Sequence, residues 1–332
     1  MQEVTILKGS YRNQPLSDIK CILLKPIKFG AKGWFGNFSI PDMGTIRVQL
    51  PSEGSLAYHG QVVSDAIVQL QVEVEESITD EEIGSRIEDR FKILGEITNG
   101  VASDDVRSLI VSGAPGTGKS VGIQNILERS QGANNIEFNK VSGSIVSAYQ
   151  LYQTLFDNSE LNSVLILDDC DSLLFDVGCL NLLKAALESG NKPRVVSYHS
   201  DSVVQLGLPK SFVFDGRIIF ITNINFQTVI DKDRNISKHL SALVDRSLYL
   251  DLTMHSKREI WCRIHTMVTK HGMLNDFNFD QKTIDLLLEY IKERRDDFRS
   301  YSLRTVIQLA QFVKTSPTGW RRMSEAFQIR PR

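Results

Sequence analysis

The chain has 332 residues and a formal net charge of −2, and 42 % of its residues are hydrophobic against 23 % charged. These values are typical of a globular protein of about two domains, and no apolar run approaches the roughly 20 residues that a membrane helix needs. Residues 1–4 lack the basic and apolar regions of a signal peptide, and the four cysteines are too scattered for a disulfide or zinc framework. We therefore expect a cytoplasmic protein without a membrane partner.

Residues 1–75 are expected to form a small β-rich domain. Residues 21–24, 45–50 and 66–72 have the composition of strands, and glycine and proline separate them. A barrel or a sandwich would accommodate such strands. The domain is followed by an acidic segment, since residues 61–100 carry ten Asp or Glu and only three Lys or Arg.

Residues 76–253 alternate between helical and strand patterns. Residues 79–82 have the form of a capping box, which predicts a helix with Ile83 and Ile87 on its apolar face. Strands that alternate with helices form a parallel sheet, so the sequence predicts an α/β core. The predicted strands are residues 108–112, 136–138, 164–167, 217–221 and 248–252.

Residues 254–332 have a helical pattern throughout. A second capping box at residues 256–259 and the stretches 283–294 and 302–314 predict three helices, which would form a lid separate from the core. The C-terminal end is basic, because residues 289–332 carry ten Lys or Arg and five Asp or Glu. Such an end is compatible with contacts to a phosphate backbone, and also with a solvated helix face and tail.

Eight residues after the first core strand match the phosphate-binding pattern Gly-x-x-x-x-Gly-Lys-Ser. The strand before them and the apolar helical spacing after them are the context that this loop requires. Backbone N–H groups and the helix dipole would hold a nucleoside triphosphate, Lys119 would reach its β- and γ-phosphates, and the Ser120 hydroxyl would bind Mg²⁺. The predicted nucleotide-binding residues are Gly113, Ala114, Pro115, Gly116, Thr117, Gly118, Lys119 and Ser120.

Polar residues follow two later strands of the predicted core. Asp168 and Asp169 end the apolar run 164–167, which is the form of a Walker B motif. Asp168 would hold Mg²⁺ through its water shell, and Asp169 would orient or deprotonate the attacking water. Asn223 ends the next apolar strand, where it would position water between the acid and the γ-phosphate.

Together these motifs resemble those of the AAA+ ATPases over residues 80–315, with Asn223 as sensor 1. In that family an arginine before the last core strand acts in the neighbouring subunit's ATP site, and Arg246 matches it. The resemblance therefore implies ATP hydrolysis with Mg²⁺ in a ring of identical subunits, expected to be a hexamer. Arg304 resembles the sensor 2 arginine of the third lid helix; we expect it to face the nucleotide, with Ile307 on the buried face of that helix.

Two departures from the family pattern bear on function. Asp169 stands where many members have Glu, and its shorter arm would make water activation less effective. Residues 141–149 lack the aromatic-hydrophobic-Gly loop with which AAA+ unfoldases grip polypeptide. This absence argues against the threading of protein through a ring.

The segment between the Walker B motif and sensor 1 is extended. Residues 194–199 and 211–214 are compatible with a hairpin, which in a ring can face the central channel. Lys192, Arg194 and Lys210 would offer positive charge to a nucleic-acid phosphate or to an acidic protein surface. A hairpin that lies only on the surface is the alternative.

Within the family, the motifs look most similar to those of the stand-alone AAA ATPases of large tailed phages. That resemblance implies remodelling or movement of DNA in replication, recombination or packaging, with residues 1–75 recruiting the substrate or a partner. Two other functions stay open. One is a protein-remodelling chaperone whose client docks on residues 1–75, and the other is a slow ATP-dependent switch or scaffold.

Overall fold

The computed structural model describes residues 2–11, 14–30, 33–40, 44–58, 78–143, 145–188, 193–199, 207–232 and 234–330. The chain divides into two compact units, Met1–Thr79 and Asp80–Arg332. No helix within the described ranges is long and apolar enough to cross a lipid bilayer.

The first unit is an antiparallel sheet with the strand order β3-β2-β6-β5-β4-β1-β7. One side of the sheet is buried: in β5, Phe38 and Ile40 are buried, whereas Asn37 and Ser39 are partly exposed. The predicted β-rich region is confirmed, and the predicted strand 66–72 lies outside the described residues. The elements are β1 Gln2–Ile6, β2 Gly9–Tyr11, β3 Gln14–Leu16, β4 Ile19–Gly30, β5 Gly33–Ile40, β6 Gly44–Leu50, the 3-10 helix η1 Glu53–Ser55 and β7 Leu56–Tyr58.

The second unit is built on a parallel sheet of five strands in the order β14-β8-β13-β10-β9. Every residue of β8 and β13 is buried, which explains why both strands are almost uninterrupted apolar runs in the sequence. The predicted α/β core is confirmed. Its strands are β8 Ser108–Ser112, β9 Glu137–Ser142, β10 Ser163–Asp168, β13 Arg217–Thr222 and β14 Leu248–Asp251.

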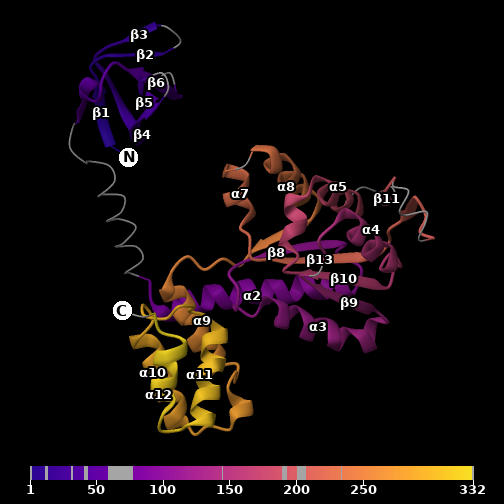
Figure 1. The fold of residues 1–332 in the computed structure, drawn as a ribbon. Helices are drawn as coiled ribbons and strands as arrows, with labels where there is room; N and C mark the ends of the chain where they lie inside the picture. Colours follow the sequence, from indigo (N-terminus) through magenta and orange to yellow (C-terminus); the bar gives the residue numbers. More distant parts are fainter. Residues whose placement is uncertain are drawn as a thin grey trace. The chain divides into compact units, whose positions relative to one another are not determined.

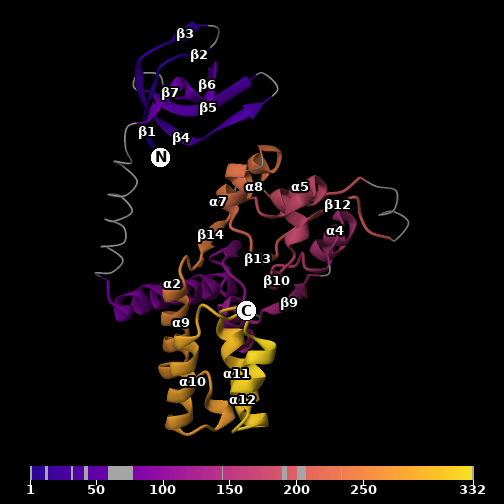
Figure 2. The same ribbon diagram turned by 60° about the vertical axis from the view of Figure 1, so that its left-hand side comes forward.

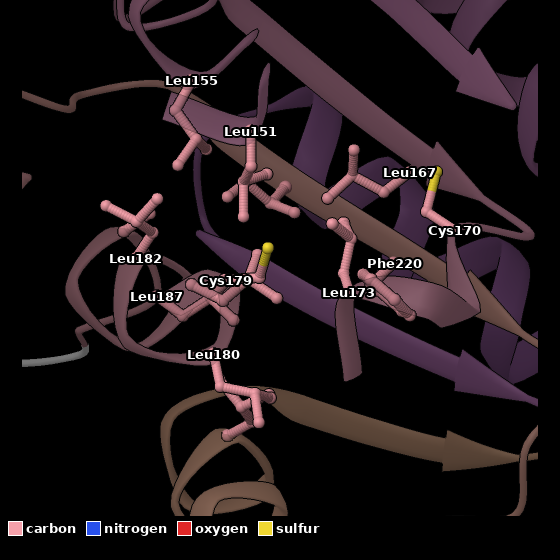
Figure 3. Close-up of a cluster of buried hydrophobic side chains, with 14 of the residues drawn as sticks. Leu151, Leu155, Leu167, Cys170, Leu173, Cys179, Leu180, Leu182, Leu187 and Phe220 are labelled. Atoms are coloured by element: carbon pink, nitrogen blue, oxygen red, sulfur yellow. The ribbon is translucent and has the colours of Figure 1, made fainter. Parts of the chain in front are cut away.

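Helices cover both faces of this sheet (Figure 1). On one face, α2 and α3 pack against Val164 and Ile166 of β10. On the other face, α4, α5, α7 and α8 enclose a larger apolar cluster, which contains Leu151 of α4 and Leu167 and Phe220 of the sheet (Figure 3). These helices are α2 Asp80–Ala102, α3 Lys119–Asn134, α4 Ala148–Asp157, α5 Val177–Ala186, α7 Phe226–Lys232 and α8 Arg234–Arg246.

The helical part after β14 forms a bundle that has its own apolar core (Figures 1 and 2). Helix α2 serves both cores, because Ile87 packs with the bundle and Leu94 packs with the sheet. The described part contains four α-helices here, so the prediction of three is wrong: the short α12 is held by Trp320, whose ring lies 4.9 Å from that of Tyr290. The elements are α9 Lys257–Thr269, the 3-10 helix η3 Asn275–Phe277, α10 Gln281–Glu293, α11 Leu303–Thr315 and α12 Trp320–Phe327.

The segment between β10 and β13 holds the 3-10 helix η2 (Asp171–Phe175), α5 and the predicted hairpin. The hairpin is confirmed: β11 (Val195–Ser197) and β12 (Ser211–Val213) pair antiparallel. Arg194, however, is only 5 % exposed, and it donates to the carbonyl oxygens of Ala186 at 3.0 Å and Gly216 at 2.7 Å. Its assignment as a contact for DNA phosphates is therefore wrong. Lys210 is exposed, and Lys192 lies outside the described residues.

Candidate nucleotide-binding site

The phosphate-binding loop connects β8 to α3, which begins at Lys119. Gly116 and Gly118 have φ angles of 73° and 96°, a left-handed conformation that glycine adopts without steric strain. A Cβ atom at Gly116 would also lie 2.8 Å from Ser302 Oγ, so glycine lets the lid approach the loop. The loop leads directly into a helix N-terminus, where free backbone N–H groups and the helix dipole favour an anion.

Lys119 is folded over its own loop. Its side chain is buried, and its Nζ atom donates to the carbonyl oxygens of Gly113 at 2.5 Å and Ala114 at 2.9 Å and to Asn223 Oδ1 at 3.3 Å. Burial lowers the pKa of Lys119, and the nearby carboxylates, Asp169 first among them, oppose that shift. An ammonium group so placed is available to an anionic ligand that replaces these carbonyl oxygens.

Asp168 and Ser120 lie together at the foot of the loop. Ser120 Oγ donates to Asp168 Oδ1 at 2.9 Å, which places a hydroxyl and a carboxylate oxygen side by side. Such hard oxygen ligands fit Mg²⁺, which usually takes one or two protein groups and completes its shell with water and phosphate. The described part of the chain contains no cluster of three or more His, Cys, Asp or Glu side chains that could hold a metal ion.

Asp169 and Asn223 are joined across the ends of neighbouring strands. Asn223 Nδ2 donates to Asp169 Oδ1 at 2.6 Å, while the Oδ1 atom of the same amide accepts from Lys119. Asp171, the next carboxylate, accepts from Thr222 Oγ1 at 2.6 Å. Burial raises the pKa of Asp171, with a further increase from the charge of Asp169 and an opposing effect from Thr222.

A cleft of about 590 Å³ extends from this cluster toward the lid. Asp169 and Asn223 line it together with the loop, and Arg304 lines it from α11. The lid touches the loop directly, since the Leu303 backbone N–H donates to Gly116 O at 3.0 Å. Ile307 also lines the cleft and is 38 % exposed, so its assignment to the buried face of α11 is wrong.

Arg246, at the end of α8, is not among the described residues that line this cleft. Its Nε atom lies 3.0 Å from Glu188 Oε2, and its Nη1 atom donates to Ala242 O at 3.0 Å. About a third of the side chain, 32 %, remains exposed. Arg246 therefore lies outside the described lining of the cleft in its own chain.

Two further cations lie near the loop or Asp168, and neither was predicted from the sequence. Lys140 Nζ of β9 lies 2.9 Å from Asp168 Oδ2, on the side away from Ser120. Arg263 of α9 lines the cleft near the loop. Neither belongs to a local motif. The register of β9 against β10 would have indicated Lys140. It pairs Asp168 with Ser142, and Lys140 precedes Ser142 by two residues, on the same face of the sheet.

The strand order, the phosphate-binding loop after β8, the paired acids after β10 and the helical lid against the loop define the class: this chain has the AAA+ P-loop ATPase fold. It is 33 % identical to a protein of Enterobacteria phage T4, the uncharacterized 36.7 kDa protein in the nrdC-mobD intergenic region, over 98 % of each chain. The chain belongs to the family of that phage protein. No protein-family model matches the sequence.

Three solved structures are similar at low identity. The replication initiator DnaA bound to AMPPCP and single-stranded DNA is 14 % identical over 71 % of this chain and 63 % of that chain, with a TM-score of 0.41. The RuvB Holliday junction branch migration motor of Thermotoga maritima is 15 % identical over 74 % and 65 %, with a TM-score of 0.40. NtrX of Brucella abortus in complex with ATP is 14 % identical over 68 % and 49 %, with a TM-score of 0.42. The chain spans less than two thirds of each of these proteins.

Proposed function

We propose that this protein is an ATPase that binds ATP and Mg²⁺ at residues 113–120 and works as a self-assembled ring, expected to be a hexamer. One observation carries the proposal. The ends of β8, β10 and β13 bring Lys119, Asp169 and Asn223 to one end of a single cleft, and Asp168 lies next to Ser120, which also lines it. In an open parallel α/β sheet, ligands bind at the carboxyl ends of the strands.

Each side chain in this cluster has a role in phosphoryl transfer. Lys119 would exchange its carbonyl contacts for β- and γ-phosphate oxygens. Ser120 and Asp168 would hold Mg²⁺, which when bound offsets the charge of the phosphate oxygens. Asp169 would take a proton from the attacking water, and Asn223 would keep that carboxylate in place through the hydrogen bond of 2.6 Å.

Self-assembly is proposed because Arg246 lies outside the cleft of its own subunit. A cation supplied in trans stabilises charge on the transferred phosphoryl group, and Arg246 fits that role if a neighbouring subunit's cleft lies against α8. Its partner Glu188 would then be exchanged for phosphate oxygens. Arg304 would act in cis, from the lid wall of the same cleft.

We further propose that residues 76–253 act as the nucleotide-binding core and residues 254–332 as the lid and basic C-terminal end. Residues 1–75 would recruit the substrate or a protein partner. For the substrate we propose DNA in a phage setting, in replication, recombination or packaging. Support comes from the lack of an aromatic-hydrophobic-Gly loop in residues 141–149, which disfavours polypeptide threading. With Arg194 occupied, the exposed Lys210 is the described hairpin base that remains for DNA.

The rate of ATP hydrolysis separates this proposal from its alternatives. It should be measured with single-stranded DNA, with duplex DNA, with an unfolded protein and with no addition. Stimulation by DNA alone supports the proposed substrate. Stimulation by unfolded protein alone would replace DNA with a protein client, and negligible turnover under all conditions, with ATP bound, would indicate a slow switch or scaffold.

A further inference from the structure

Three arginines of the second unit are almost completely buried. Arg194, Arg217 and Arg263 are 5 %, 2 % and 6 % exposed. A guanidinium group has only donors, and burial without acceptors is costly, so each of these groups should have oxygen partners. Two of them do. The acceptors are the carbonyl oxygens of Ala186 and Gly216 for Arg194, and those of Val101, Ala102 and Leu161 for Arg217.

Arg263 differs from both, because no carbonyl oxygen among the described residues accepts from its guanidinium. Its Nε atom, like that of Arg217, is buried without a hydrogen-bond partner, and its guanidinium lies 3.6 Å from the ring centroid of Phe91. None of the described salt bridges includes Arg263. Glu88 is near enough to favour the charged form, but it pairs with Lys270 and His271. Burial lowers the pKa of Arg263 to about 10, so the group remains charged at neutral pH.

The position of this charge points to its ligand. Arg263 lines the cleft from α9, and a Cβ atom at Gly118 would lie only 3.7 Å from its Nη2 atom. Gly118 is the residue that precedes α3, where the loop and the helix N-terminus favour an anion. An anionic ligand that enters the cleft beside the loop would therefore lie close to Arg263 as well.

We propose that Arg263 is a nucleotide-binding residue that donates from the lid to phosphate oxygens of the nucleotide held by residues 113–120. Guanidinium groups match phosphate in shape and charge, and such charge-assisted hydrogen bonds are about twice as strong as neutral ones. The ligand would thereby give hydrogen-bond acceptors to a buried cation whose Nε atom has no partner in the free protein. This inference rests on the proposed nucleotide site.

The test compares Arg263→Met with Arg217→Met, which removes a buried guanidinium of the same size from carbonyl partners. Affinities for ADP and adenosine are measured by calorimetry or by competition with a fluorescent ADP analogue, and thermal unfolding is followed with and without ADP. Arg263→Met should weaken ADP binding about 10- to 100-fold and leave adenosine binding unchanged. The free variant should unfold near the wild-type temperature, since an unpaired buried charge has been removed, and its stabilisation by ADP should be smaller.

Arg217→Met should behave in the opposite way, with a lower unfolding temperature in the free state and an unchanged ADP affinity at a temperature where it is folded. If Arg263→Met does not fold, Arg263→Gln is measured instead, because it keeps hydrogen-bonding capacity without charge. Unchanged ADP affinity in the folded variant would overturn the inference, and so would an equal loss for adenosine and ADP, which would assign Arg263 to the nucleoside. A wild-type protein that binds no nucleotide would overturn the proposed function as well.

Discussion

The two walls of the cleft between core and lid differ in how their polar groups are satisfied. On the core wall, Lys119, Asp168 and Asn223 already bind one another or nearby oxygens at 2.5–3.3 Å. On the lid wall, Arg263 has a buried Nε atom without a partner, and Arg304 faces the cleft from an exposed position. The core wall is preorganised in the free protein, whereas the lid wall needs a ligand to complete it. Substitutions on the two walls should therefore have different consequences.

The largest effect is expected at Lys119. Lys119→Ala removes the ammonium group from the phosphate end of the core wall and should reduce ATP affinity below detection, by 10³-fold or more. Calorimetric titration with ATP measures this. Lys282→Ala, an exposed lysine of α10, is the control and should bind like the wild type. Substantial ATP binding by Lys119→Ala would mean that the core wall is not the phosphate site.

Substitution of Arg246 tests whether hydrolysis at one cleft needs a side chain from a second subunit. Arg246→Ala should lower the rate of hydrolysis on the order of 10³-fold and leave ATP affinity nearly unchanged. Mixed with Lys119→Ala subunits it should recover part of the activity, because a mixed interface pairs an intact loop with an intact arginine. Demonstrated co-assembly without any recovery would remove Arg246 from the trans role.

A substitution at Asp169, on the core wall, should lower the rate of ATP hydrolysis without a comparable loss of ATP affinity. Asp169→Asn keeps the hydrogen-bonding shape, and asparagine tolerates the left-handed backbone at this position, where φ is 55°. We expect ATP affinity within about threefold of the wild type and a rate lower by about 10²-fold or more, since the proton acceptor is lost. Binding and turnover are measured separately. Undiminished turnover would shift the role of the base to Asp171.

Arg304 should show a smaller effect than the core residues. Arg304→Gln removes an exposed cation from the lid wall and should weaken ATP binding about tenfold, without a change in thermal stability of the free protein. Arg322→Gln, at an exposed position of α12, is the matched control. A loss as large as that of Lys119→Ala would contradict the distinction between the two walls.

Asp251, at the end of β14, accepts from Ser112 Oγ at 3.0 Å, directly before the phosphate-binding loop, and its contribution to stability should depend on pH. Although burial alone would raise the pKa of Asp251, hydrogen bonds from Thr253 and Ser112 lower it overall. A lowered folded pKa stabilises the fold above the ordinary carboxyl pKa, and this stabilisation is lost as pH falls toward the folded value. Asp251→Asn should therefore be less stable by about 1 kcal/mol at pH 7, with a smaller difference near pH 3. Denaturant unfolding at both pH values measures this, and a constant difference would contradict it.

The sequence predicted what lies in contiguous segments. The loop 113–120 and the acids after β10 are recognisable because neighbours along the chain set their conformation. Arg263 and Lys140 were missed because the fold brings them near Gly118 and Asp168, which are distant from them in sequence. The prediction that Arg194 contacts phosphate was wrong for the same reason. A basic residue beside a hairpin is expected to be exposed, and its burial depends on carbonyl groups that are distant in sequence.

The left-handed backbone at Asp169 limits how this site could be redesigned or could evolve. Replacing it with glutamate, as in many AAA+ proteins, would lengthen the arm of the carboxylate that we propose as the base. Glutamate, however, tolerates a positive φ less readily than aspartate or asparagine. A longer carboxylate at this position would therefore require a reshaped turn between β10 and η2. If Asp169 has the proposed role, its reach and the backbone of the turn must change together, and a single exchange to glutamate should not raise the rate of hydrolysis.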